Sequence, residues 1–169
     1  RPEFEVLTGL TTDYMPAGCV PYQYVNKEIQ SYPALFKDMG YRTLAVHPYL
    51  SNFYQREAKY PYLGFDETYF EEELYKIEEI GVSVRGKNIS DDTFIDYITH
   101  FMDNSDAPTF LFGISMEGHQ PYPQKFTEEE FDLNVSSDRL DGETLNIVRQ
   151  YAQCIADADK ALAKLVEWA

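Results

Sequence analysis

The sequence has few cysteines and no long apolar run. Its only cysteines, Cys19 and Cys154, lie far apart in the 169 residues. Two cysteines neither complete a zinc site nor define a disulfide framework, so the redox compartment stays open. Apolar runs such as residues 110–114 fall far short of the roughly 20 residues that span a bilayer. No signal peptide is visible at the charged opening Arg1-Pro2-Glu3, so any membrane contact is expected only through anchor segments outside this chain.

Basic residues are also scarce. Lysine and arginine total 14 against 29 aspartates and glutamates, which gives a formal net charge of −15. DNA or RNA would meet a repulsive field that no basic run offsets, so we predict no nucleic-acid partner. The same charge repels anionic lipid, although a Debye length of about 8 Å at physiological salt limits the range of that repulsion.

Common catalytic signatures are absent from the sequence. It contains no HExxH, GxSxG, CxxC, Walker A or GxGxxG pattern, so the usual zinc-protease, serine-hydrolase and nucleotide-binding machinery is not indicated. Two acidic triplets occur, at residues 71–73 and 128–130. Three consecutive carboxylates on a helical turn point in different directions, which favours solvated faces over metal sites.

The composition is that of one globular domain with an excess of aromatic residues. Hydrophobic residues make up 44% of the chain, enough for a packed core. The 14 tyrosines and 11 phenylalanines exceed what a minimal core requires. Tyrosine suits sites that must be apolar and hydrogen-bonding at once, so the excess hints at a ligand groove.

Hydrophobic periodicity predicts alternating helices and strands. The patterns indicate a helix from Asn26 to Met39 before Gly40, a strand at Tyr41–Val46, a helix at Ser90–Met102, a strand at Thr109–Ile114 and a helix from Asp141 onward. The last helix is expected to run for about 25 residues. This alternation predicts an α/β fold with a parallel sheet, and two secure strands suggest part of a larger sheet.

Two histidines follow the two predicted strands. His47 comes directly after the first strand, and His119 lies a few residues past the second. Ligands bind beyond the carboxyl ends of parallel strands, so these imidazoles could converge on one crevice, or each could make only a local hydrogen bond. Arg56 could bind a phosphate or sulfate, or could pair with Glu57 or another carboxylate. His100, in the middle of a predicted helix, is expected to be structural.

Several motifs, taken in order, resemble one enzyme family. They are PEFEVLTGL, YPALFKDMGYRTLAVHPY, FYQREAKYPYLGFDE, ISDD and PTFLFGISMEGHQPY, and they cover residues 2–122. They resemble the lipoteichoic-acid synthase group, phosphoglycerol transferases of the sulfatase and alkaline-phosphatase-like superfamily. The resemblance implies a partial three-layer α/β fold with a mostly parallel sheet. It also implies that residues 1–169 are an incomplete extracellular domain of a membrane-anchored protein.

The resemblance further implies a metal-dependent reaction. In this family a threonine and a divalent cation, usually manganese, take glycerol phosphate from phosphatidylglycerol to build a cell-envelope polymer. By the resemblance, the threonine lies just upstream of Arg1, and the metal ligands lie earlier or beyond Ala169. The chain is therefore expected to carry no catalytic residue and no metal ligand, and to be inactive alone.

The substrate side of the family site does match this sequence. The resemblance implies that His47, Arg56 and His119 contact glycerol phosphate, with Tyr54 where some members have tryptophan and Gln55 replacing the usual asparagine. Two alternatives stay open. One is a hydrolase of sulfate or phosphate esters, although the C/S-x-P-x-R motif of true sulfatases is absent. The other is a non-catalytic module that binds a carbohydrate or protein.

Overall fold

The computed structural model describes residues 2–169, which form two compact units interleaved in sequence. Unit 1 contains the residues up to Lys76 and Phe101–Ile114, and unit 2 contains Ile77–His100 and Ser115–Ala169. The helices are α1 (Pro2–Thr8), α2 (Tyr32–Asp38), α3 (Arg56–Lys59), α4 (Glu71–Leu74), α5 (Asp91–Asp103) and α6 (Gly142–Trp168). The strands are β1 (Arg42–His47), β2 (Glu67–Phe70), β3 (Val84–Arg85), β4 (Asn88–Ile89) and β5 (Thr109–Gly113).

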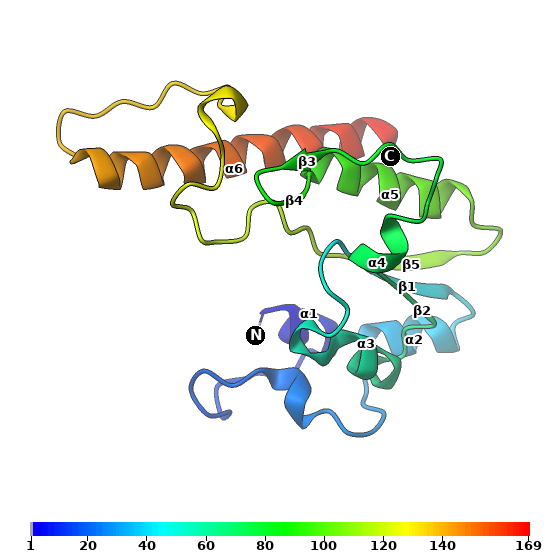
Figure 1. Cartoon of the computed structure of the whole chain (residues 1–169). Helices are drawn as coiled ribbons and strands as arrows, with labels where there is room; N and C mark the ends of the chain where they lie inside the picture. The colour runs from blue at the N-terminus through cyan, green and yellow to red at the C-terminus, as the bar shows by residue number, and fades with distance from the viewer. Residues whose placement is uncertain (1) are drawn as a thin grey trace. The chain divides into compact units, whose positions relative to one another are not determined.

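A parallel sheet organises unit 1 (Figure 1). Its strand order is β2-β1-β5, and both pairings of the central strand β1 are parallel, with Leu44 opposite Glu67 on one side and Leu111 on the other. Every residue of β1 after Arg42 is buried, as expected for a central strand covered on both faces. The predicted α/β class with a parallel sheet is confirmed.

Helix α2 begins later than predicted. The predicted start at Asn26 was wrong, because Ser31 adopts an extended conformation and its side chain accepts a hydrogen bond from the Ala34 amide at 3.2 Å. Pro33 lies in the first turn, where its missing N–H costs nothing. The strand that follows, β1, is shifted by only one residue and ends on His47.

Strand β2 was not predicted from the sequence. The hydrophobic patterns predict no strand between residues 47 and 89, yet Glu67–Phe70 pairs with β1. This strand has four residues, of which only Phe70 is fully buried. So short a segment carries no periodicity of its own, and its pairing with β1 defines it. The short α1 and the antiparallel β3–β4 pair were missed for the same reason.

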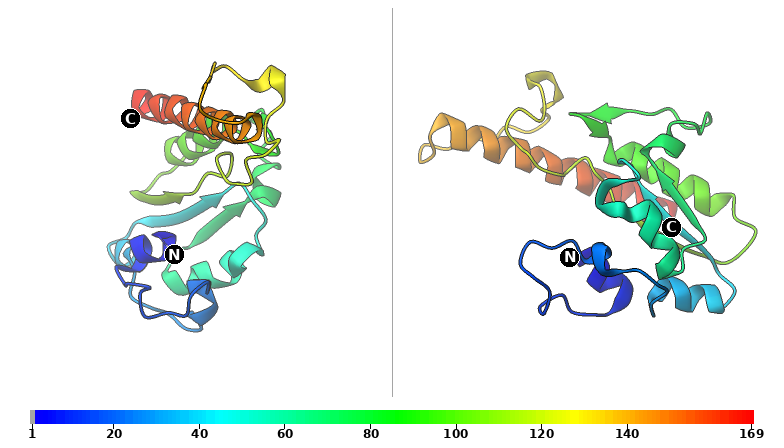
Figure 2. Two further views of the ribbon diagram at one scale, coloured as in Figure 1. Left: turned by 90° about the vertical axis from the view of Figure 1, so that its left-hand side faces the viewer. Right: turned by 60° about the horizontal axis from the view of Figure 1, so that its bottom comes forward.

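Unit 2 is built on α6 (Figure 2). This helix has 27 residues and begins after Asp141, whose side chain accepts from the Thr144 amide at 2.8 Å. The length and start agree with the prediction. The unit 2 part of α5 lies beside α6, and Lys164 pairs with Asp92 at 3.1 Å and Asp96 at 2.7 Å. Within residues 2–169, no helix combines the length and apolarity needed to cross a bilayer.

Candidate functional site

His47 is the last residue of strand β1, and its side chain is hydrogen-bonded to the residue that follows β5. The side chain is 2% exposed, and Nδ1–H donates to the Ile114 carbonyl, just after β5, at 2.9 Å. A carbonyl oxygen can only accept, so Nδ1 carries the proton and the neutral ring has Nε2 as its acceptor. The parallel register of β1 and β5 thus sets both the tautomer and the ring orientation.

The turn after His47 contains two consecutive left-handed residues. Tyr54 has φ 58° and ψ 16°, and Gln55 has φ 60° and ψ 28°, although neither is glycine. Such conformations cost roughly 1–3 kcal/mol each and persist where surrounding contacts hold them, often at functional sites. The turn directly precedes Arg56, the first residue of α3, so the strain sits next to the predicted anion-binding residue.

A chain of ring contacts joins His47 to Arg56. Ring centroids are 6.2 Å apart for His47 and Tyr49, 5.1 Å for Tyr49 and Phe53, and 4.2 Å for Phe53 and Tyr54. The Arg56 guanidinium carbon lies 5.1 Å from the centroid of the Tyr54 ring, within cation–π range. Three of the four predicted substrate residues therefore belong to one connected group in unit 1.

The partner of Arg56 is Glu3, which the sequence analysis did not single out. Arg56 Nε donates to Glu3 Oε1 at 3.0 Å and Nη2 donates to Oε2 at 2.8 Å, a two-point pair between a buried guanidinium and a partly buried carboxylate. The hydroxyls of Tyr22, at 2.8 Å, and Tyr60 also donate to Oε1. The alternative of a pair with Glu57 or another carboxylate is realised with Glu3, in a largely buried ion pair formed across 53 positions of the chain.

This cluster keeps Glu3 ionised. Burial by itself would raise the pKa of Glu3, but the hydrogen bonds and charge of Arg56, with the hydroxyls of Tyr60 and Tyr22, outweigh burial and hold it below its usual value. Burial, reinforced by the Glu3 charge, raises the pKa of Tyr60, so this phenol stays protonated and acts as a donor. The group therefore carries one paired negative and one paired positive charge at neutral pH.

A pocket of about 130 Å³ lies beside this cluster. Its lining comes from α1, the loop before Tyr22 and the strained turn: Glu3, Phe4, Gly18, Cys19, Val20, Pro21, Tyr22 and Tyr54. Tyr54 is 43% exposed and so presents its ring to this space while covering the guanidinium. The pocket combines aromatic faces with hydrogen-bonding groups, and its volume is below the roughly 300–1,000 Å³ of typical small-molecule sites.

His119, the fourth predicted substrate residue, lies in unit 2. Its side chain is exposed, and Nδ1–H donates to the Gln120 carbonyl at 2.6 Å. Its own carbonyl accepts from the buried Lys125 Nζ at 3.0 Å, which fixes the backbone of this loop. The predicted convergence of His119 with His47 joins residues of different units and stays a prediction.

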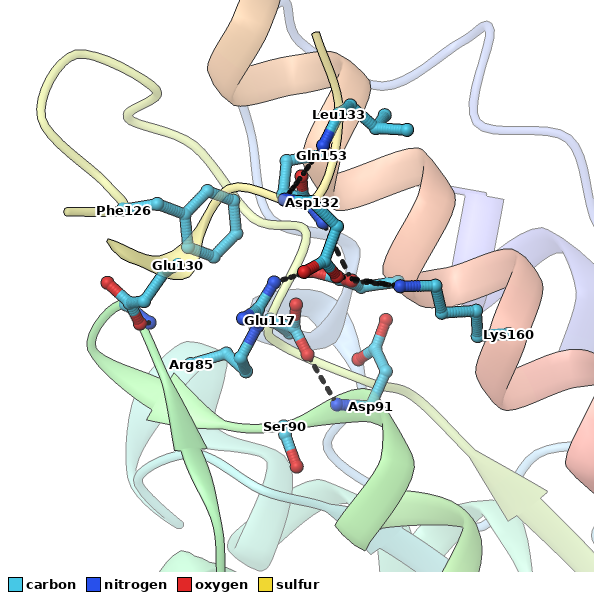
Figure 3. Close-up of polar contacts among 12 residues, drawn as sticks. Arg85, Ser90, Asp91, Glu117, Phe126, Glu130, Asp132, Leu133, Gln153 and Lys160 are labelled. Carbon is cyan, nitrogen blue, oxygen red and sulfur yellow. Dashed lines mark hydrogen bonds and ion pairs between the residues drawn. The ribbon is translucent and has the colours of Figure 1, made fainter. Parts of the chain in front are cut away.

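A buried polar network supports the loop that carries His119 (Figure 3). The Asp91 amide donates to Glu117 Oε2 at 2.6 Å, and Arg85 Nη2 donates to Asp157 Oδ2 at 2.7 Å. Gln153 Nε2 donates to Asp157 Oδ1 at 3.0 Å. Glu117 Oε1 is buried and, taken as a carboxylate oxygen, has no hydrogen-bond donor among residues 2–169. A protonated Glu117 can instead donate to a neighbouring carboxylate.

The Glu117 carboxyl is expected to make stability pH-dependent. Burial, with the nearby Asp91 and Asp157 charges, raises its pKa from 4.5 to about 7. Because the folded-state pKa is raised, the stabilisation is complete below 4.5 and is lost as the pH rises through about 7. Glu117→Gln mimics the protonated acid and should be more stable than the native protein by roughly 1–3 kcal/mol at pH 8.

Urea denaturation of native protein and Glu117→Gln at pH 5 and pH 8 tests this expectation. The two proteins should be nearly equal at the lower pH. Glu129→Gln, at an exposed member of the second acidic triplet, is the matched control and should leave the pH dependence unchanged. If the unfolding free energy of Glu117→Gln changed between pH 5 and pH 8 as much as that of the native protein, Glu117 would not be the source of the pH dependence.

The acidic side chains that the structure describes form no cluster of metal ligands. Among residues 2–169, no group of three or more histidine, cysteine, aspartate and glutamate side chains is placed to hold a metal ion. In the two acidic triplets, Glu73 and Glu130 instead accept hydrogen bonds from the amides of Phe70 and Thr127. The resemblance places the ligands of its divalent cation outside residues 1–169, so no metal-binding role is assigned to these side chains.

Solved structures share this fold. Lipoteichoic acid synthase LtaP from Listeria monocytogenes matches with a TM-score of 0.76 and 24% identity over 98% of this chain and 38% of that chain. The phosphoglycerol transferase GacH from Streptococcus pyogenes, solved with sn-glycerol-1-phosphate, matches with a TM-score of 0.72 and 22% identity over 98% of this chain and 42% of that chain. At these identities the similarity shows an alkaline-phosphatase-like fold.

Sequence comparison extends the similarity beyond the fold. A Rhizobium meliloti (strain 1021) protein, provisionally named a cyclic beta-1,2-glucan modification protein, is 31% identical over 168 residues. These residues are 99% of this chain and 25% of that protein, so the chain spans about a quarter of its curated relative. The sequence profile of the sulfatase family matches residues 1–169. The chain therefore belongs to the sulfatase family.

Proposed function

We propose that this chain is the substrate-binding part of an extracellular phosphoglycerol transferase domain. The full-length protein takes glycerol phosphate from phosphatidylglycerol and transfers it to a cell-envelope polymer. A threonine nucleophile and a manganese ion complete the site from residues outside 1–169, and membrane segments elsewhere anchor the protein. The name of the Rhizobium relative favours a carbohydrate as the acceptor.

The strained turn between His47 and Arg56 is the observation that carries this proposal. It places a guanidinium, an imidazole and aromatic faces together at the carboxyl end of a parallel strand, where α/β proteins bind ligands. The positive charge and planar N–H donors of a guanidinium suit the oxygens of a phosphate. An aromatic ring can pack against the C–H groups of glycerol. The GacH structure, with its bound sn-glycerol-1-phosphate, shares this fold.

Each residue has a defined role in the proposal. Arg56 donates to a phosphate oxygen, and Tyr54 covers the apolar side of the ligand. His47 has its Nδ1 proton bonded to Ile114, so its Nε2 accepts from a ligand hydroxyl or holds a second proton. His119 lies in unit 2, and its contact with the phosphate stays an expectation from the family resemblance. These groups bind and orient the substrate, and the bond-breaking chemistry belongs to groups outside this chain.

Turnover of two substrates by the full-length protein tests the proposal. With manganese present, we expect release of product from fluorescent phosphatidylglycerol and none from an aryl sulfate. Sulfate release with inert lipid would instead support a hydrolase, which membership of the sulfatase family also allows. If the protein turns over neither substrate, the result would favour the alternative of a non-catalytic module that binds a carbohydrate or protein. The 169-residue chain alone is expected to turn over neither substrate.

Two exposed tyrosines supply a matched pair of variants. Tyr54→Ala removes the ring that covers Arg56 and should lower kcat/KM for the lipid by about tenfold, as expected for the loss of one aromatic contact to the substrate. Tyr14, which is 94% exposed in the same unit, serves as the control, and Tyr14→Ala should leave turnover unchanged. Equal effects of the two substitutions would count against a binding role for the turn.

A further inference from the structure

The Glu3 carboxylate accepts more hydrogen bonds than the ion pair with Arg56 alone would provide. Glu3 receives four hydrogen bonds: two from Arg56, one from Tyr22 and one from Tyr60. Tyr22 and Tyr60 are themselves buried and pack edge-on, with ring centroids 5.7 Å apart. A carboxylate bonded at both oxygens by buried donors has little freedom to move, so its position is set by the core of unit 1.

The pairing decides which edge of Arg56 remains for a ligand. Nε and Nη2 both point at the Glu3 carboxylate. Nη1 makes only a long bond of 3.4 Å to the Phe53 carbonyl, near the limit at which a hydrogen bond still contributes. Nη1 is therefore the nitrogen with the most capacity for a further acceptor, and Glu3 determines where it points.

The same contact holds the strained turn. Arg56 follows Tyr54 and Gln55, whose left-handed conformations are unfavourable on their own. The guanidinium carbon lies 5.1 Å from the centroid of the Tyr54 ring and 5.9 Å from that of the Phe53 ring, both within cation–π range. Anchoring Arg56 to α1 through Glu3 thus fixes the end of the turn and the ring that covers the guanidinium.

We propose that Glu3 is the positioning residue of the phosphate site: it binds the Nε and Nη2 edge of Arg56, leaves Nη1 with capacity for a further acceptor and holds the Tyr54–Gln55 turn. This inference rests on the proposed function, because it assigns Glu3 a task at the same site. Glu3 also lines the pocket, but its negative carboxylate would repel a phosphate, so we assign it no direct contact with the ligand. It acts through Arg56, and the inference is therefore tested by coupling between the two residues.

Affinity for sn-glycerol-1-phosphate, measured by calorimetry on the full-length protein, tests the coupling. Glu3→Gln should weaken binding by about tenfold, or ~1.4 kcal/mol. In an Arg56→Lys background, which has no planar fork to orient, Glu3→Gln should cause no further loss. Glu5→Gln is the matched control on the same helix, because Glu5 bonds Thr12. It should bind as the native protein does.

Amide hydrogen exchange gives a readout that does not depend on the ligand. Glu3→Gln should speed exchange at residues 51–57 and leave α6 unchanged. Should Glu3→Gln fail to fold, Tyr60→Phe removes one hydrogen bond to the carboxylate and should give a smaller change in the same direction. Additive affinity losses in the double variant, or native affinity in Glu3→Gln, would overturn the inference while leaving the proposed function intact.

The two hypotheses fail in different ways. Native protein that does not bind glycerol phosphate overturns the proposed function. The exchange comparison then still decides whether Glu3 holds the turn. Faster exchange confined to residues 51–57 supports that role, and unchanged exchange in Glu3→Gln overturns it.

Discussion

Arg56→Met is expected to destabilise the protein by about 3–5 kcal/mol at pH 7, because it leaves Glu3 buried without its counter-charge. The Arg56 and Glu3 side chains are 6% and 17% exposed, so solvent cannot replace the lost partner. Methionine preserves much of the packing of the arginine stem, and the loss therefore reports on the charge pair. Urea denaturation, read as the change in midpoint at constant slope, measures it.

The same variant should reverse the pH dependence that comes from Glu3. In the native protein the pKa of Glu3 is lowered, so its stabilisation is present above the unfolded value of 4.5 and is lost as the pH falls through the folded value. Without Arg56, burial raises this pKa, and the variant should regain stability as the pH falls from 7 toward 5. Exposed ion pairs typically contribute less than about 1 kcal/mol to the free energy of unfolding. If Arg56→Met lost no more than this and kept the native pH dependence, the Glu3–Arg56 pair would not be buried as the structure shows.

Gly64→Ala should destabilise the protein by roughly 3 kcal/mol or more, since it combines a strained backbone with a steric clash. Gly64 follows Leu63 with φ 90°, in the left-handed region. A Cβ there would lie 2.5 Å from Ala34 Cα and 2.6 Å from Ala34 N, both backbone atoms of α2. The clash can be relieved only by moving α2 away from the turn.

Gly40→Ala separates the two contributions. Gly40 has a similar φ of 85°, but a Cβ there meets nothing within 4 Å. Its loss should stay near the roughly 1 kcal/mol that a left-handed alanine costs. Thermal unfolding of both variants gives the comparison, and equal losses would show that the approach of Gly64 to Ala34 contributes nothing.

Much of the fold could be predicted because it depends on local signals. The 27-residue α6 has a long apolar stripe and a capping aspartate, and β1 is a short apolar run bounded by glycine and proline. Interactions within a few residues determine such elements, so periodicity and capping suffice to find them. The position of His47 after a buried strand follows from the same patterns.

The tertiary structure alone decided the rest. Strand β2 exists because β1 pairs with it, and Glu3 meets Arg56 only when α1 packs against the turn that precedes α3. Glu117 is a raised-pKa acid only because Asp91 and Asp157 are brought beside it. By itself, the sequence determined the α/β class, the main helices and strands, and the candidate residues His47, Tyr54, Arg56 and His119. Which carboxylate holds Arg56 was settled by packing, because the energy of a charge pair depends on distance and burial, and neither is encoded locally.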